Sequence, residues 1–389
     1  MEEAGVAEAD LLIAVTEIDE LNMISCLIAK QYGVKKTVAR IRNPEYLENT
    51  KFSPTTSIGI DLVINPERVT AKMISKLIHV PEAINVEYYA DGKVQLLELY
   101  IKKDSPVVNK SLIEINFPKP NLIVAILRDE KMIIPRGSDV LKPGDLIFVI
   151  AETKNMLAVE KVLGEKRTKV ENVIILGGGR IGYYLAKLLE KKPVSVKVID
   201  KDLEVCRKIS SELNDTLVLH GDGTDISLLE EEDTGKADMF IAVTNDDKVN
   251  LLVSLLAKHL GAKKTAAQIR RSDYVPLIEK VGIDVAVSPR MLTAGAILQF
   301  IRRGDIVSVT LLGSAKAEMI ELVVPDSSKI VKKPLKKLKF PRHAIIGAIV
   351  RGNDVIVPTG DDFINPGDRV MVFALPEAIK KVEKFFAPC

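Results

Sequence analysis

One unit of sequence occurs twice in this chain, and the repeat limits the folds that the chain can adopt. The segment that begins at Ala9, ADLLIAVTEIDELNMISCLIAKQYGVKKTVARIR, aligns without a gap with the segment that begins at Ala237, ADMFIAVTNDDKVNLLVSLLAKHLGAKKTAAQIR. Farther along each copy, RDEKMIIPRGSDVLKPGDLIFVIA recurs as RGNDVIVPTGDDFINPGDRVMVFA. Repetition on this scale means that one domain arrangement is used twice. The sequence therefore predicts a tandem duplication.

Each copy has two parts with different hydrophobic patterns. In the first part of the second copy, apolar runs at 173–176, 194–199, 216–219, 239–243 and 265–269 alternate with helical patterns at 181–189, 203–213 and 249–260. Strands separated by helices of this length predict right-handed βαβ crossovers and a Rossmann-like parallel sheet, hence the α/β class. The second part has short β-rich runs, a Pro-Gly-Asp turn and a closing helix, which predicts a small α+β domain.

The repeat divides the chain into two units of three segments each. In the first unit we expect a partial Rossmann-like domain (1–67), a crossover helix (68–83) and a small α+β domain (84–165). In the second unit we expect a complete Rossmann-like domain (168–289), a crossover helix (290–304) and a second small α+β domain (305–389).

The first copy is shorter than the second. It aligns only from the approach to the fourth strand, so it lacks the glycine turn, the first two crossovers and the acidic end of the second strand. There are three explanations: the chain is a fragment, its start was assigned too late, or the first domain has decayed. A half-sheet exposes a parallel edge and an apolar face. We therefore expect residues 1–67 to be less stable than the second copy, or to fold only with a partner.

Charge and hydropathy exclude several classes of protein. The 389 residues include 55 Lys plus Arg and 53 Asp plus Glu, a balance that does not suit a nucleic-acid-binding protein. Apolar runs such as 122–127 are strand-sized and far below the roughly 18–20 residues that span a bilayer. The four histidines are scattered, with no metal-ligand spacing and no partner for acid–base catalysis. We expect no metal site, no catalytic residues and no direct membrane insertion.

A glycine turn in the second copy is the strongest local motif. Gly177, Gly179 and Gly182 form G-x-G-x-x-G directly after an apolar strand and at the start of a helix. Such a turn brings backbone N–H groups and a helix N-terminus to a pyrophosphate. Asp200 ends the next strand, where a carboxylate accepts hydrogen bonds from ribose hydroxyls and disfavours the 2′-phosphate of NADP. Arg180, inside the turn, either reaches phosphate or is a solvated surface arginine.

Polar residues follow the third and fourth strands at the same edge of the predicted sheet. Asp222 is a candidate for contact with an adenine or ribose edge, and the alternative for this segment is that Thr224 or Asp225 caps the following helix. Thr244 and Asn245 end the fourth strand, and Thr16 and Glu17 are their counterparts in the first copy. Lining of a nucleotide cleft and capping of the following helix are both compatible with these residues.

Taken together, GGGRIG, HGDGTD, ADMFIAVTNDDKVNLL, AAQIR and VIVPTGDDFINPGDRVMVFA resemble the TrkA family, the cytoplasmic regulatory subunits of Trk potassium uptake systems. That family is built from RCK domains (regulators of potassium conductance), each with an RCK-N and an RCK-C part. The resemblance covers the chain apart from the missing first part of the first RCK-N domain.

The resemblance implies a peripheral cytoplasmic protein that binds NAD(H), and in relatives ATP or ADP. It also implies a homo-oligomeric ring of RCK domains that gates a separate membrane potassium-translocating subunit of the Trk type. By position, the family's nucleotide residues fall on Gly177, Gly178, Gly179, Arg180, Ile181, Asp200, Thr244 and Asn245, and, in the surviving half-site, on Thr16, Glu17 and Arg40. Gln268 stands at the position equivalent to Arg40. An RCK regulator of another cation channel or antiporter, and an NAD-dependent oxidoreductase, are the alternatives.

Overall fold

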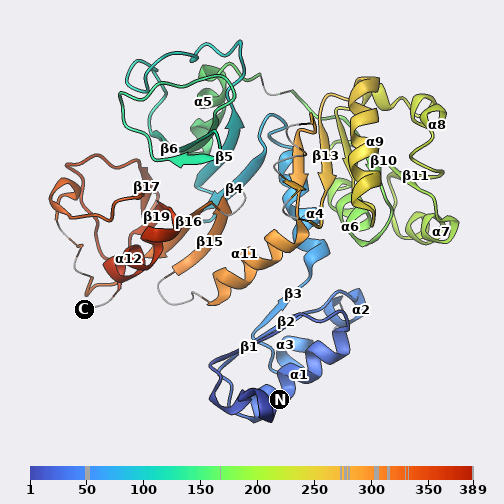
Figure 1. Ribbon diagram of the computed structural model, residues 1–389, viewed down its shortest axis with the longest axis horizontal. Helices are drawn as coiled ribbons and strands as arrows, with labels where there is room; N and C mark the ends of the chain where they lie inside the picture. The colour runs from blue at the N-terminus through green and yellow to red at the C-terminus, as the bar shows by residue number, and fades with distance from the viewer. Residues whose placement is uncertain are drawn as a thin grey trace.

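The computed structural model places four β-sheets in two units, as the repeat predicts (Figure 1). It describes residues 1–48, 53–166, 168–271, 274–275, 278, 281–301, 306–312, 316–328, 330–331 and 333–387. Within these residues, one sheet has three strands, one has six and two have five. The predicted α/β class and the tandem duplication are confirmed.

The six-stranded sheet forms the first part of the second unit. Its strands are β9 (Asn172–Leu176), β10 (Ser195–Asp200), β11 (Thr216–His220), β12 (Met239–Ala242), β13 (Thr265–Gln268) and β14 (Val285–Val287). They lie in the order β11-β10-β9-β12-β13-β14, and every neighbouring pair is parallel. From β9 the chain adds β10 and β11 on one side, and it then returns to add β12, β13 and β14 on the other side of β9. In doubly wound sheets, ligands bind in the crevice that opens at this point.

The helices of this domain match the predicted ones closely. They are α6 (Arg180–Leu189), α7 (Leu203–Glu212), α8 (Ile226–Glu231) and α9 (Asp247–Leu260). The side chain of Asp246 caps α9 by accepting hydrogen bonds from the N–H groups of Lys248 and Val249, which also lowers the pKa of Asp246. Gly261, with φ of 116°, ends the helix in the left-handed region.

The first part of the first unit has a three-stranded parallel sheet. It contains β1 (Leu11–Ala14), α1 (Asp19–Gln31), β2 (Lys36–Arg40) and β3 (Leu62–Ile64), with the short helices α2 (Pro44–Glu48) and α3 (Pro54–Ser57). The strand order β1-β2-β3 reproduces β12-β13-β14. Within the described residues, the first unit contains no counterpart of β9, β10 or β11. The described strands of this copy thus correspond to the fourth, fifth and sixth strands of the second copy.

The crossover helices α4 (Pro66–Leu77) and α11 (Pro289–Ile301) are exchanged between the two units. Ala71, Ile74 and Leu77 of α4 share a buried cluster with Ile175 and Leu185 of the second unit. In return, Phe300 of α11 is buried with Val38 and Ile64 of the first unit, with Ala296 and Ile297 packed beside it. Figure 1 shows α4 beside α6, and α11 reaching toward β3.

The structure corrects two expectations about the first unit. A face of the half-sheet that we expected to be uncovered is covered by α11, although Ile13 and Val15 at the β1 edge remain 39% and 46% exposed. In addition, α4 ends at Leu77 rather than at 83, because the chain turns at His79 and Val80 to reach the next domain. For the second crossover helix, residues 302–304 lie outside the described residues.

The second part of each unit is an antiparallel five-stranded sheet. The first contains β4 (Asn85–Tyr89), β5 (Val94–Tyr100), β6 (Asn121–Arg128), β7 (Lys131–Ile133) and β8 (Leu146–Glu152), followed by α5 (Met156–Val162). The second contains β15 (Ile306–Leu312), β16 (Ala317–Val323), β17 (Ala344–Arg351), β18 (Asp354–Ile356) and β19 (Arg369–Ala374), followed by α12 (Pro376–Phe386). Their strand orders, β4-β5-β8-β6-β7 and β15-β16-β19-β17-β18, are equivalent.

The Pro-Gly-Asp turn has the same role in both of these domains. Its aspartates, Asp145 and Asp368, are 1% and 2% exposed. Each accepts two hydrogen bonds from one guanidinium, that of Arg128 at 2.7 Å and that of Arg351 at 2.8–3.0 Å. A bidentate pair of this kind satisfies a carboxylate that would be costly to bury alone.

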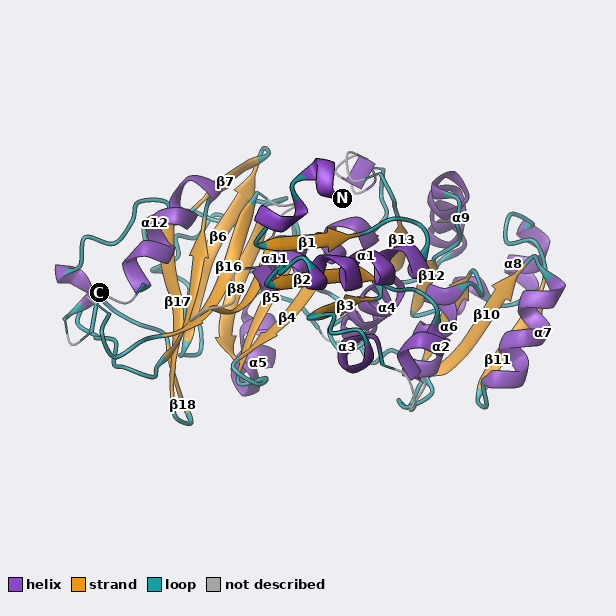
Figure 2. Ribbon diagram, turned by 90° about the horizontal axis from the view of Figure 1, so that it is seen from below, coloured by secondary structure: helices purple, strands orange, loops and turns teal. Residues whose placement is uncertain are grey.

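The two five-stranded sheets pack face to face (Figure 2). Phe148 of the first sheet and Phe373 of the second lie in one buried cluster, with ring centroids 6.2 Å apart. On the outer face of the second sheet, α12 buries Ile379, Val382 and Phe386. The two units are thus joined both through the crossover helices and through their second domains.

Candidate nucleotide-binding site

Three glycines of the turn between β9 and α6 are required by close contacts. A Cβ on Gly177, which has φ of 105°, would lie 2.9 Å from the backbone nitrogen of Thr244. On Gly178 it would lie 2.8 Å from Cδ1 of Ile209, and on Gly182 it would lie 1.9 Å from the carbonyl oxygen of Gly177. The first glycine therefore permits the turn, and the last lets α6 pack directly on it.

Gly179 differs from the other three. It is the N-cap residue of α6, no side chain caps the helix there, and a Cβ built on it would meet nothing within 4 Å. Arg180 is exposed at the first position of the helix. Ile181 is only 8% exposed and its side chain lies in the core, so only its backbone N–H is available to a ligand. The open position faces the unpaired N–H groups at the N-terminus of α6, which favour an anion.

Asp200 joins this turn to the end of β10. Its Oδ2 accepts a hydrogen bond of 2.6 Å from the N–H of Gly178, and its Oδ1 accepts one of 2.8 Å from the N–H of Asp202. Asp200 is partly exposed, and a carboxylate has further lone pairs for ribose hydroxyls. The arrangement fits a nucleotide whose phosphates meet the glycine turn and whose ribose meets Asp200.

The segment after β12 lies directly beside the glycine turn. The N–H and the hydroxyl of Thr244 both donate to Oδ1 of Asn250, at 2.9 and 2.7 Å. Asn245 is exposed, and its Oδ1 accepts a hydrogen bond of 2.6 Å from Nη2 of Arg270. The structure thus brings the glycine turn, Asp200, Thr244 and Asn245 to one edge of the sheet.

The predicted helix cap is confirmed at Asp225, the N-cap residue of α8, whose side chain accepts a hydrogen bond of 2.9 Å from the N–H of Ser227. Asp222 bonds instead to Thr224, two residues further along the chain. Its Oδ1 accepts hydrogen bonds from the N–H and the hydroxyl of Thr224, at 2.9 and 2.8 Å. These bonds, first that of the N–H, lower the pKa of Asp222. The side chain is exposed at the end of β11, and its contact with adenine or ribose stays a prediction.

The first unit keeps half of the equivalent site. Thr16 makes the same pair of hydrogen bonds to Asn22 that Thr244 makes to Asn250, and Glu17 is exposed beside it. Nη2 of Arg40 donates to the carbonyl oxygen of Thr16 at 2.7 Å. The described part of this unit has no glycine turn, so its described residues include no equivalent of the phosphate contacts that we expect from the turn of the second unit.

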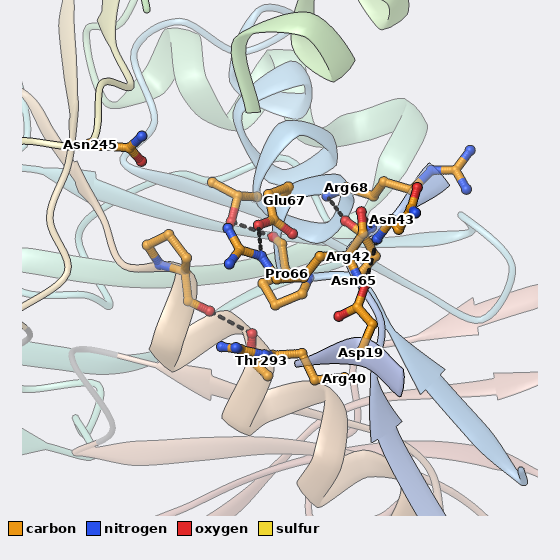
Figure 3. Close-up of polar contacts among 12 residues, drawn as sticks. Asp19, Arg40, Arg42, Asn43, Asn65, Pro66, Glu67, Arg68, Asn245 and Thr293 are labelled. Atoms are coloured by element: carbon orange, nitrogen blue, oxygen red, sulfur yellow. Dashed lines mark hydrogen bonds and ion pairs between the residues drawn. The ribbon is translucent and has the colours of Figure 1, made fainter. Parts of the chain in front are cut away.

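The two units also differ at the arginine that follows the fifth strand of the repeat. In the first unit, Nε of Arg42 donates to Oε1 of Glu67 at 2.5 Å, as Figure 3 shows. Oδ2 of Asp19 accepts from the N–H groups of Arg42 and Asn43, both at 2.8 Å. In the second unit, the equivalent Arg270 binds Asn245 instead. Sequence reasoning missed Glu67, whose counterpart in the repeat is an arginine.

Asn22 and Asn250 were also missed, although both stand at the same position of the repeat. Their identity in the two copies was the available signal. Among the described residues, no group of three or more His, Cys, Asp or Glu could hold a metal ion. No helix in the same part of the chain is both long and apolar enough to cross a membrane.

Two tandem units, each with a parallel α/β domain, a crossover helix and a small α+β domain, define the class of duplicated α/β proteins, and the second unit carries a glycine turn of the nucleotide-binding type. The TrkA-N domain family matches residues 1–66 and 173–289, and the TrkA-C domain family matches residues 96–164 and 319–387. The chain belongs to the TrkA family.

Curated relatives agree with this assignment over almost the whole chain. The "Trk system potassium uptake protein TrkA homolog 1" of Methanosarcina mazei is 41% identical, with 97% of this chain and 86% of that protein aligned. The "Trk system potassium uptake protein TrkA" of Halomonas elongata is 38% identical, with 99% and 86% aligned. These names describe potassium uptake and no catalysed reaction, which agrees with the expectation of a non-enzymatic protein.

The fold is also that of a solved channel structure. The structure titled "GsuK channel bound to NAD" has a TM-score of 0.58 and 21% identity, and the alignment covers 98% of this chain and 67% of that chain. At this level of identity the likeness concerns the fold alone.

Proposed function

We propose that this protein is a cytoplasmic regulatory subunit that binds NAD(H) in its second unit and thereby gates a separate membrane subunit that translocates potassium. The observation that carries the proposal is the open position at Gly179, which is surrounded by three glycines that have no room for a side chain. A turn that served packing alone would have no reason to keep that fourth position free.

Asp200 supports an unphosphorylated ribose and hence NAD(H) rather than NADP. ATP or ADP would use the same phosphate and ribose contacts, so adenine nucleotides compete in this proposal. The half-site at Thr16, Glu17 and Arg40 is expected to bind poorly, because the phosphate-binding turn is absent from the described part of the first unit.

The crossover helix α4 offers a route from the nucleotide to the rest of the molecule. The guanidinium of Arg68 lies 5.3 Å from the ring centroid of Tyr184 on α6, the helix that the glycine turn opens. Nζ of Lys192 donates to the carbonyl oxygen of Ser75 at 2.7 Å. We propose that a bound nucleotide changes the angle between the units through these contacts, because a ligand acts only through its different affinity for two conformations.

Exposed apolar residues support assembly into a ring. Leu21 and Ile24 on α1 are 45% and 53% exposed, and Leu252, the counterpart of Ile24 on α9, is 51% exposed. Because each unit presents a similar helix face, we propose that neighbouring copies pack through α1 and α9 and that the ring docks under the membrane subunit. Ile24→Asp together with Leu252→Asp is expected to reduce the oligomer mass in light scattering, and an unchanged mass would contradict this assignment.

Calorimetric titration with NADH, NAD, ATP and ADP tests the nucleotide site. About one nucleotide per chain is expected, with binding lost in Gly179→Asp, whose carboxylate repels phosphate at the open position. Absence of binding to the folded chain would contradict the proposal. For gating, potassium flux through the reconstituted complex has to change with nucleotide, and an unchanged flux would exclude regulation.

The second candidate is an RCK regulator of another cation channel or antiporter. The similarity of the fold to the GsuK channel favours it. Copurification of the potassium-translocating subunit with the tagged protein separates the two candidates, because only the first requires a Trk-type partner.

A further inference from the structure

Asn250 is a buried amide on α9 whose hydrogen bonds tie the carboxyl ends of two neighbouring strands together. It is 0% exposed. Its Oδ1 accepts from the N–H and the hydroxyl of Thr244, and its Nδ2 donates to the carbonyl oxygens of Thr244 and Gln268, at 3.1 and 3.0 Å. Both donors and both acceptor positions of the amide are therefore used.

The same four bonds recur in the first unit. Asn22 is also 0% exposed, and its Oδ1 accepts from the N–H and the hydroxyl of Thr16 at 2.8 and 2.7 Å. Its Nδ2 donates to the carbonyl oxygens of Thr16 and Arg40, at 3.0 and 2.8 Å. Because the described part of this unit has no glycine turn, the network is a property of the strand–loop–helix segment itself.

In the second unit, the segment that Asn250 holds also touches the glycine turn. The nitrogen and Cα of Thr244 lie 2.9 and 3.1 Å from the position that a Cβ on Gly177 would occupy. Thr244 therefore packs so closely beside Gly177 that no side chain fits between them, and a displacement of Thr244 would change the space at the glycine turn. The position of this segment relative to the open space at Gly179 depends on the four bonds of Asn250.

We infer that Asn250 is the positioning residue of the nucleotide site: it fixes Thr244 and Asn245 against the glycine turn without touching the ligand. The inference rests on the proposed function, because it concerns affinity for the same nucleotide. Asn22 makes the same four bonds in a unit whose described residues include no glycine turn, and therefore provides a matched control.

The experiment compares Asn250→Ala with Asn22→Ala in the full chain. Both variants leave the N–H of a threonine without its acceptor, so amide exchange at Thr244 or Thr16 is expected to accelerate, and each is expected to lower the melting temperature. Only Asn250→Ala is expected to weaken NADH binding, by about tenfold, since backbone groups that are left unpaired allow the segment after β12 to shift. Unchanged affinity in Asn250→Ala, or an equal loss in Asn22→Ala, would overturn the inference.

Asn250→Asp covers the case in which the alanine variant does not fold. It keeps the acceptor for the N–H and hydroxyl of Thr244 but loses both donors, so its affinity for NADH is expected to lie between those of the wild type and the alanine variant. Affinity equal to that of the wild type, with accelerated exchange at Thr244, would contradict the positioning role. Failure of the wild type to bind either NADH or ADP would instead contradict the proposed function.

Discussion

The N–H of Gly178 donates a hydrogen bond of 2.6 Å to Oδ2 of Asp200. The residue expected to bind the ribose therefore also fixes the turn expected to bind the phosphates. The two halves of the nucleotide site are linked by this bond, so a change in Asp200 affects both.

Asp200→Asn is expected to weaken NADH binding by about 1.5–3 kcal/mol, the range for hydrogen bonds to charged groups. Calorimetric titration measures the change. Asp233→Asn is the control, because Asp233 is an exposed carboxylate of the same domain that pairs with Lys236 and is not a candidate site residue. An equal loss of affinity in both variants would mean that net charge, rather than the bond to Gly178, determines the affinity.

Two glycines of the turn are expected to respond oppositely to alanine. Gly179→Ala adds a methyl group to open space at φ of −60°, so it should leave stability unchanged or raise it by about 0.4–1 kcal/mol while it obstructs the nucleotide. Gly182→Ala should destabilise the second unit by about 1–3 kcal/mol, because the methyl group would collide with the carbonyl oxygen of Gly177. Thermal unfolding and titration with NADH separate the two effects. If Gly179→Ala destabilised the protein, the conclusion that a side chain has room at position 179 would be wrong.

Lys264 predicts a pH dependence of stability. It is 7% exposed, its Nζ donates to the carbonyl oxygens of Pro81 and Ala83, and burial lowers its pKa to about 8. The unfolded chain then binds more protons than the folded chain between about pH 8 and 10.5, so the contribution of Lys264 to stability increases as the pH rises through this window.

Lys264→Met removes this titration. Between pH 8 and 10, the urea midpoint of the wild type is therefore expected to rise relative to that of the variant. Urea unfolding at a series of pH values measures it. Lys36→Met, the counterpart in the repeat, should keep the pH dependence of the wild type. Parallel curves for the wild type and Lys264→Met would contradict the prediction.

The half-sheet of the first unit is expected to be the least stable part of the chain. Phe300 of α11 covers this half-sheet: it is 4% exposed and is buried with Val38 and Ile64. Phe300→Ala should cost about 3–5 kcal/mol and accelerate proteolysis within residues 1–67. Phe386→Ala, in the core of the last domain, should leave cleavage in that region unchanged. Hydrogen exchange in residues 1–67 as slow as in residues 170–289 would contradict the expectation.

The order of elements and the glycine turn could be predicted from sequence because both depend on neighbouring residues. Apolar periodicity located the strands and helices of the second unit within a few residues, and the spacing of Gly177, Gly179 and Gly182 located the turn. The segment after β11 has two interpretations from sequence, because Asp222 suits a ligand whereas Thr224 and Asp225 suit a helix cap. Only the structure shows that Asp225 caps α8 and that Oδ1 of Asp222 accepts hydrogen bonds from the N–H and the hydroxyl of Thr224.

By itself, the sequence determined that one unit is used twice and located the glycine turn of the second copy. The tertiary structure decided that α4 covers the second unit while α11 covers the first, and that the two five-stranded sheets bury Phe148 against Phe373. It also decided that Arg42 pairs with Glu67 whereas Arg270 binds Asn245. The physical reason is that periodicity fixes which face of an element is apolar, whereas the partner of that face depends on packing between residues far apart in the chain.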